Sequence, residues 1–193
     1  MEEFNEFSQI IIKIESGEKQ AYEELYEKTI QDVYKNVHFL IEDKADIDDL
    51  VQEVYIQLFR SLKNFNVERH FKPWLMGIVF KQVQSYRRKR WMRFRISKKV
   101  EEINEIKESD YTKETIEKLV NNQLVKLVDE LPYKLKQVII LRYLNDYSQE
   151  EISRILHIPL GTVKSRINAG ITKLREKGKN RKIFEEVRNV YEF

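Results

Sequence analysis

Side chains that can donate hydrogen bonds to bases and phosphates gather between residues 162 and 182. Eight Lys or Arg residues stand there against a single acid, Glu176. Lys, Arg, Asn and hydroxyl side chains bind base edges in the major groove, and Asn suits adenine in particular. Taken alone, such a basic run is equally consistent with a solvated helix face. Its interpretation depends on the elements that position it.

Those elements have the layout of a helix-turn-helix. Ser148 and Glu151 have the S-x-x-E spacing of a capping box, in which the hydroxyl and the carboxylate each bond the other residue's backbone N–H. A short helix follows, and His157-Ile158-Pro159 turns the chain. The next helix carries four apolar residues at helical spacing: Val163, Ile167, Ile171 and Leu174. In this motif the second helix enters the major groove, so the layout favours DNA binding over a plain helical hairpin.

The apolar spacing leaves a polar face on the last helix. The side chains predicted to face outward are Lys164, Ser165, Asn168, Thr172 and Arg175. Arg166 and Lys173 flank this face and are expected to contact phosphates.

The first half of the chain predicts three amphipathic helices. One spans about residues 19–40, with Tyr22 and Tyr26 on its apolar face, and a second spans about 46–62. The second has a stripe of apolar residues at helical spacing: Ile47, Leu50, Val51, Val54 and Leu58. Residues 63–70 are polar and aperiodic, which indicates a loop. Pro73 suits the first turn of the third helix, and we expect Trp74 on that helix to be part of the core.

The charge changes sign along the chain. Residues 81–99 contain nine Lys or Arg and no acid, whereas residues 101–117 contain seven acids and two lysines. Two basic segments separated by an acidic one are typical of two phosphate-binding modules on a tether. We therefore expect a flexible acidic linker that ends near Thr115. Helices resume near Ile116, and one of them ends at Pro132.

Composition limits the fold and the function. The 193 residues are 41% apolar and 35% charged, with only five Gly and three Pro, which predicts an all-α protein of two small helical domains. Without cysteine, disulfides and thiolate zinc sites are excluded. The apolar run Ile10-Ile11-Ile12 ends at Lys13, and no run approaches the roughly 18 residues of a membrane span. We expect a cytoplasmic protein without membrane insertion.

Several segments together resemble the extracytoplasmic-function sigma factors, in the order and spacing of that family, from about residue 10 to residue 180. Residues 131–142, 147–152 and 161–166 resemble region 4, which reads the −35 promoter element. Residues 48–55, Asp-Asp-Leu-Val-Gln-Glu-Val-Tyr, resemble region 2.2, the polymerase-binding helix. Residues 71–75 and the pair Arg87-Arg88 resemble regions 2.3 and 2.4.

The resemblance implies a non-enzymatic protein with no catalytic residue, cofactor or metal. Its partners would be the clamp helices and flap of core RNA polymerase, promoter DNA and an anti-sigma factor. Residues 1–96 would form region 2, residues 97–115 the linker, residues 116–180 region 4 and residues 181–193 a C-terminal tail. The polymerase-binding residues would be Asp49, Gln52, Glu53 and Ile56. The −35 residues would be Thr162, Lys164, Ser165, Arg166, Asn168, Thr172 and Arg175.

The resemblance also implies a surface that holds the melted −10 strand. Its residues would be His70, Lys72, Lys81, Gln84, Ser85, Arg87 and Arg88, with His70, Phe71 and Lys72 at a loop edge. Many relatives have Asn at the position of Lys81 and Asp at the position of Ser85. The base preference of those relatives at the −10 element therefore cannot be carried over to this sequence. Opening the strand costs on the order of a few kcal/mol per base, which such contacts must offset.

Two alternatives remain open at this point. A metal-dependent nuclease would use the acids Asp43, Asp46, Asp48, Asp49 and Glu53. Acids in a first helical turn more often complement the helix dipole, and no histidine completes a site. A stand-alone helix-turn-helix regulator explains the second half but leaves the helix at 46–62 and the basic helix after Pro73 without a role.

Overall fold

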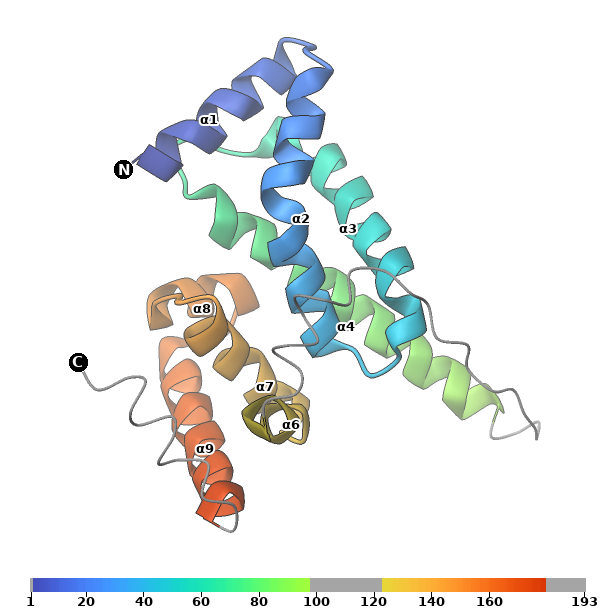
Figure 1. The fold of residues 1–193 in the computed structure, drawn as a ribbon, viewed down its shortest axis with the longest axis vertical. Helices are drawn as coiled ribbons and strands as arrows, with labels where there is room; N and C mark the ends of the chain where they lie inside the picture. The colour runs from blue at the N-terminus through green and yellow to red at the C-terminus, as the bar shows by residue number, and fades with distance from the viewer. Residues whose placement is uncertain (1, 98–122, 180–193) are drawn as a thin grey trace. The chain divides into compact units, whose positions relative to one another are not determined.

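All regular structure in the residues described here is helical, as the scarcity of Gly and Pro predicts. The computed structural model describes residues 2–97 and 123–179 (Figure 1). The chain divides into two compact units, residues 1–109 and 110–193, which we describe separately. The predicted linker beyond Ser97, the start of the helix expected at Ile116 and the C-terminal tail lie outside the described residues, so the predicted domain boundaries stay predictions.

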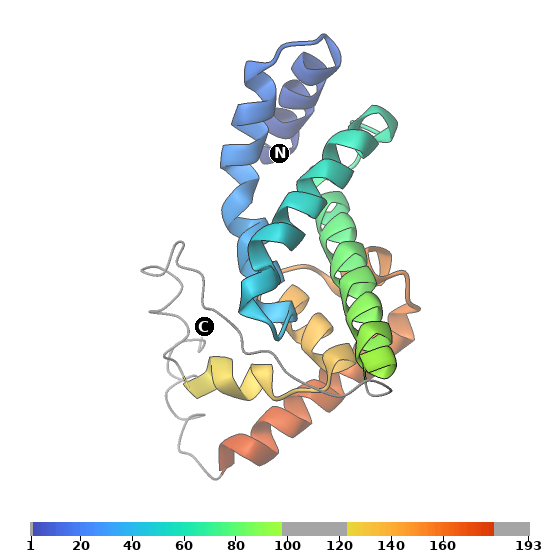
Figure 2. The same cartoon turned by 90° about the vertical axis from the view of Figure 1, so that its right-hand side faces the viewer.

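The first unit contains the long helices α1 (Glu2–Glu15), α2 (Gln20–Leu40), α3 (Ile47–Ser61) and α4 (Phe71–Ser97). Helix α2 packs against the other three, and α3 also packs along α4 (Figures 1 and 2). The predicted ranges of α2 and α3 are correct to within two residues. On α3 the buried side chains are the predicted stripe together with Tyr55. Pro73 lies in the first turn of α4, as expected.

Helix α1 was not among the helices predicted from the sequence. Its apolar side chains Phe7, Ile10, Ile11 and Ile14 are all buried. They recur at i, i+3, i+4 and i+7, the pattern of an amphipathic helix. Ile10, Ile11 and Ile14 therefore belong to the core of this unit, whereas Ile12 is 56% exposed.

Aromatic side chains join α1, the 62–70 segment and the start of α4. The Phe7 and Phe71 rings stack at 4.9 Å between centroids, and the Phe65 and Trp74 rings lie 4.7 Å apart. Trp74 is half-buried in this cluster, which agrees with its expected core role. Phe71 corrects the expected loop edge, because it is 3% exposed and begins α4. The predicted loop also contains a 3-10 turn at Leu62–Asn64.

A buried hydroxyl pair fixes α2 against α3. The Thr29 hydroxyl donates to the Leu25 carbonyl at 2.7 Å, so its only proton is used there. The Tyr55 hydroxyl lies 2.8 Å from Thr29 Oγ1 and must therefore be the donor in that bond. Burial raises the pKa of Tyr55, so its hydroxyl stays protonated. This pair holds the register in which α3 presents its outer face.

The second unit contains α6 (Gln123–Asp129), α7 (Tyr133–Ile139), a wide π-helical turn at Ile140–Leu144, α8 (Gln149–Leu156) and α9 (Leu160–Lys179). Helix α9 packs against α6, α7 and α8. Part of the core consists of the buried residues Leu127, Leu131, Ile139 and Leu174. A Cβ on Gly170 would lie 2.8 Å from Ile139 Cγ1, so glycine allows α7 and α9 to approach closely.

Candidate nucleic-acid interface

The turn between α8 and α9 has the predicted helix-turn-helix geometry. The Ser148 side chain accepts from the Glu151 N–H at 3.2 Å, and the Ser148 N–H donates to Glu151 Oε2 at 2.8 Å, which completes the capping box. His157 ends α8 in the left-handed conformation, with φ 51°. The Ser153 hydroxyl then bonds the Ile158 carbonyl at 2.6 Å. These local bonds fix the direction in which α9 leaves the turn.

Ser148→Ala should destabilise the second unit by about 1 kcal/mol, because the Glu151 N–H in the first turn of α8 loses its hydrogen-bond acceptor. Urea unfolding followed by circular dichroism measures this change. Ser165→Ala is the matched control, since the exposed Ser165 hydroxyl bonds only the Thr162 carbonyl of its own helix, at 3.0 Å. Equal midpoints for Ser148→Ala and the parent chain would show that the cap does not stabilise this turn.

Helix α9 presents the predicted polar face. Val163, Ile167 and Leu174 are buried, and Ile171 is half-buried. On the outer side the exposed residues are Lys164, Ser165, Asn168, Thr172, Lys173 and Arg175. Thr162 and Arg166 are half-buried at its edge. The structure thus places five of the seven predicted −35 residues on the exposed side of α9, with Thr162 and Arg166 at its edge.

Ion pairs connect the far part of α9 and the end of α6 to their neighbours. Lys177 Nζ lies 2.6 Å from Glu130 Oε2. Lys136 on α7 is almost buried and pairs with Asp129 at 2.6 Å. Lys177 already has a carboxylate partner. Lys173, which is exposed on α9, is therefore the better candidate for contact with a phosphate.

On the first unit, α3 has an outer face of mixed character. Asp49, Gln52, Glu53 and Ile56 are all exposed, with Ile56 at 39%. Tyr22 and Tyr26 of α2, expected on an apolar face, are instead 38% and 43% exposed. The Tyr22 ring contacts Phe59 of α3 edge-on, 5.1 Å between centroids. Exposed aromatic and aliphatic groups beside carboxylates suit a protein partner more than a nucleic acid.

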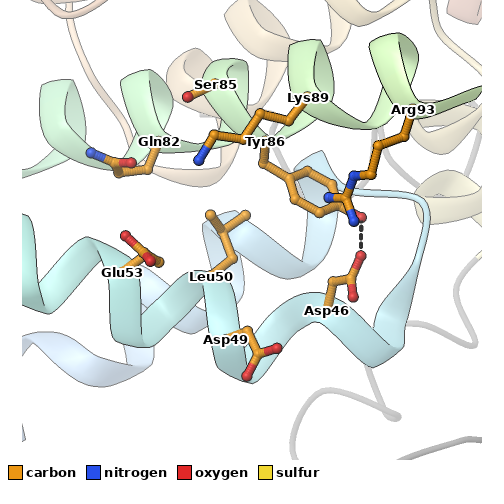
Figure 3. A pocket seen from close by; sticks show the side chains of 9 residues that line it. All are labelled: Asp46, Asp49, Leu50, Glu53, Gln82, Ser85, Tyr86, Lys89 and Arg93. Carbon is orange, nitrogen blue, oxygen red and sulfur yellow. Dashed lines mark hydrogen bonds between the residues drawn. The ribbon is translucent and has the colours of Figure 1, made fainter. Parts of the chain in front are cut away.

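A pocket of about 210 Å³ lies between α3 and α4 (Figure 3). It is lined by Asp46, Asp49, Leu50, Glu53, Gln82, Ser85, Tyr86, Lys89 and Arg93. The α3 side contributes the carboxylates, and the α4 side contributes the ammonium and guanidinium groups. Predicted polymerase-binding residues and the predicted −10 residue Ser85 therefore border the same pocket.

A hydrogen-bonded group closes one end of this pocket. The Tyr86 hydroxyl donates to Asp46 at 2.5 Å (Figure 3). Arg90 donates to Asp43 at 2.8 Å and to the Tyr86 oxygen at 3.0 Å. Partial burial raises the pKa of Tyr86, and the hydrogen bond to Asp46 adds to this rise. Asp43 and Asp46 thus bind side chains of α4. In the described parts of the chain, no three His, Cys, Asp or Glu residues are placed to hold a metal ion.

The predicted −10 residues divide between several faces of α4. Lys81, Gln84 and Arg88 are exposed, whereas Ser85 is half-buried at the pocket. Arg87 pairs with Glu42 at 3.2 Å. At the other end of the helix, Lys72 lies 3.6 Å from an Asp32 carboxylate oxygen, and His70 is exposed just before the first turn. Only part of the predicted set therefore shares one surface.

In a comparison with known protein families, the two units match two regions of the same family. Residues 25–93 match Sigma-70 region 2, and residues 121–174 match Sigma-70, region 4. This chain belongs to the extracytoplasmic-function sigma factors. It is 24% identical to the ECF RNA polymerase sigma factor SigW of Bacillus subtilis over 174 residues, which covers 86% of the chain and 93% of SigW. It is 30% identical to SigE of Mycolicibacterium smegmatis over 158 residues, which covers 81% of the chain and 61% of SigE.

Solved structures agree on the fold of this sigma factor. CnrH in complex with the cytosolic domain of CnrY has a TM-score of 0.66 at 18% identity, covering 90% of this chain and 97% of CnrH. RpoE in complex with the anti-sigma factor NepR, from Bartonella quintana, has a TM-score of 0.65 at 21% identity, covering 80% of this chain and 94% of RpoE. No helix in the described portion of the sigma factor is long and apolar enough to cross a membrane.

Proposed function

We propose that this sigma factor binds core RNA polymerase and directs it to promoters that carry a −10 and a −35 element, without catalytic activity of its own. One observation carries the proposal. A chain that matches both sigma regions exposes a basic recognition helix in one unit and an acidic, partly apolar helix face in the other. A stand-alone operator-binding regulator needs only the first of these surfaces.

In this proposal α9 reads the −35 element as duplex. Lys164 and Asn168 lie one turn apart near the start of α9, and both are exposed. Their donors therefore reach base edges when the start of the helix enters the major groove. Lys173 and Arg175 lie further along the helix, where backbone phosphates are the nearer acceptors.

The −10 element is assigned to α4 and its neighbourhood. Lys81, Gln84 and Arg88 form the exposed part of this surface, and Ser85 opens into the pocket beside Gln82. A lysine and a serine replace the Asn and Asp of many relatives. Lys81 can hold a phosphate as a point charge, and the Ser85 hydroxyl both donates and accepts. We therefore expect a −10 preference that differs from that of relatives with the Asn and Asp pair.

In this proposal core polymerase binds the outer face of α3. Gln52 and Glu53 supply polar contacts, and Ile56 supplies apolar area. Tyr22 and Tyr26 of α2 add to it, since their exposed rings contact Phe59 and Tyr55 of α3. A protein interface of this kind combines a few buried anchors with a polar rim. The polymerase elements that fit this proposal are the clamp helices for the first unit and the flap for the second.

Regulation by an anti-sigma factor is part of the proposal. The solved relatives RpoE and CnrH are each bound to a partner protein, and NepR is an anti-sigma factor. We propose that a cytoplasmic partner of this kind holds the present chain inactive. We assign residues 1–96 to region 2, 97–115 to a flexible linker, 116–180 to region 4 and 181–193 to a tail.

The function is tested by promoter binding with and without core polymerase. Fluorescently labelled promoter fragments selected from a library should bind the complex of this chain with core polymerase far more tightly than they bind the chain alone. Tight, sequence-specific binding by the isolated chain, with no gain from polymerase, would instead support a stand-alone regulator. Cleavage of the labelled DNA in Mg²⁺ without polymerase would support the nuclease alternative.

A further inference from the structure

The last three turns of α4 carry large aromatic side chains on the surface. Trp91 is 56% exposed and Phe94 is 59% exposed. Exposing two large aromatic groups so close together costs hydrophobic stabilisation that a core position would supply. A surface that keeps them next to many basic residues indicates a binding role.

Trp91 belongs to one continuous face of α4. Lys81, Gln84, Arg88, Trp91 and Arg95 follow one another at alternating steps of three and four residues, and all five are exposed. Residues at this spacing lie on one side of a helix. Helix α4 contains no Asp or Glu between Phe71 and Ser97, so no acid interrupts the face from within the helix.

The other basic residues of this part of α4 serve different surfaces. Arg90 binds Asp43 at 2.8 Å, and Arg87 binds Glu42 at 3.2 Å. Lys89 and Arg93 line the pocket toward α3 (Figure 3). The face of Lys81, Arg88 and Arg95 is therefore distinct both from the ion pairs that hold α4 in place and from the pocket.

Trp91 and Arg95 contact each other on that face. The Arg95 guanidinium carbon lies 4.6 Å from the centroid of the Trp91 ring, within cation–π distance. This contact orients the guanidinium, whose planar donors suit a phosphate, beside an indole that offers an N–H donor and a flat apolar surface. Phosphate next to deoxyribose or base is the ligand that matches a guanidinium next to an indole.

We propose that Trp91 and Arg95 extend the promoter-DNA contact of α4 about two helical turns beyond Arg88, with Arg95 on a backbone phosphate and the indole against the adjoining nucleotide. The proposal rests on the sigma function proposed above. From Lys81 to Arg95 the face is about 21 Å long. This length corresponds to about six base pairs along a B-form duplex. The region 2 family match ends at residue 93, so Arg95 lies beyond it.

The test measures how tightly holoenzyme reconstituted with the full chain binds promoter DNA across a salt series. Trp91→Ala should weaken binding about 10-fold, on the scale of an aromatic–nucleotide contact. Arg95→Ala should lower the salt slope by about one unit, with equal loss on every promoter sequence. Arg93→Ala is the matched control, because Arg93 lines the pocket toward α3 instead of this face, and it should leave binding near that of the parent.

Duplex and premelted promoters distinguish the two sources of the nucleotide. Weaker binding to premelted DNA alone assigns the contact to a single strand. Weaker binding to both forms assigns it to duplex. Either result supports the proposal. Parent-like binding by Trp91→Ala and Arg95→Ala on both forms would overturn it, as would an equal loss in all three variants. If the parent holoenzyme itself fails to bind promoters, the proposed sigma function fails instead.

A second measurement on the free protein checks the surface itself. The chain contains two tryptophans, so Trp74→Phe leaves Trp91 as the only tryptophan fluorophore. Acrylamide should quench this fluorescence readily in the free chain, because the indole is more than half exposed. Strong shielding of Trp91 in the free chain would overturn the proposal, since another part of the protein would then cover the DNA-binding face.

Discussion

Replacing Gln52 and Glu53 together with Ala should weaken the binding of this sigma factor to core RNA polymerase at least about 30-fold, while the protein stays folded. Both side chains are exposed on α3, next to Ile56, and neither belongs to the core of the helix bundle. Their loss removes polar anchors from the proposed interface and leaves the polymerase groups that they bind unpaired. Equilibrium binding of labelled sigma factor to core enzyme measures the effect, and circular dichroism checks the fold.

The matched control removes the same two side-chain types elsewhere in the same unit. Glu18 and Gln20 are exposed where the chain enters α2. The Glu18→Ala, Gln20→Ala variant carries the same net charge as the test variant and should bind core enzyme like the parent. A folded Gln52→Ala, Glu53→Ala variant with the affinity of the parent would show that the outer face of α3 is not the polymerase-binding surface.

Asn168→Ala should change which base the holoenzyme prefers at one position of the −35 element and should cost about 1–3 kcal/mol on the best promoter. The amide of Asn168 is exposed one turn after Lys164, on the part of α9 that follows the helix-turn-helix turn. An amide that makes two hydrogen bonds to adenine distinguishes it from the other bases, whereas alanine does not. Holoenzyme binding to promoters varied at each −35 position measures both changes.

Lys173→Ala is the comparison variant on the same helix. Its ammonium group is expected to bind phosphate, so binding to every promoter should weaken alike, and the salt slope should fall by about one unit. Lys177 is less suitable for this comparison, because it is already paired with Glu130. An equal loss on all promoters for Asn168→Ala, with unchanged base preference, would contradict the proposed register of α9 on DNA.

Local sequence patterns were sufficient for the helix-turn-helix of the second unit. The Ser148 and Glu151 spacing predicts the capping box, and the apolar spacing from Val163 to Leu174 predicts which face of α9 is buried. Both predictions are confirmed, because a cap and an amphipathic stripe depend on residues within a few turns of one another. Helix α1 was predictable in the same way once Phe7 is counted with Ile10, Ile11 and Ile14.

Features that depend on contacts distant in sequence were not predictable. Lys177 and Glu130 are 47 residues apart in the sequence, and Tyr86 and Asp46 are 40 residues apart. No local pattern therefore predicts either hydrogen bond. Phe71 is buried because Phe7 of another helix stacks on it. The continuation of α7 into a wide turn at Ile140–Leu144 was also not predicted from the sequence.

Run-off transcription reconstituted from purified components tests the central claim most directly. Core RNA polymerase from the source organism, this chain and a promoter library should together yield transcripts that start at defined positions. The templates that are transcribed should share a −10 and a −35 motif, and omission of the chain should abolish these transcripts. A chain that binds core enzyme or DNA and still yields no promoter-specific transcript from any template in the library would contradict its assignment as a promoter-specificity subunit.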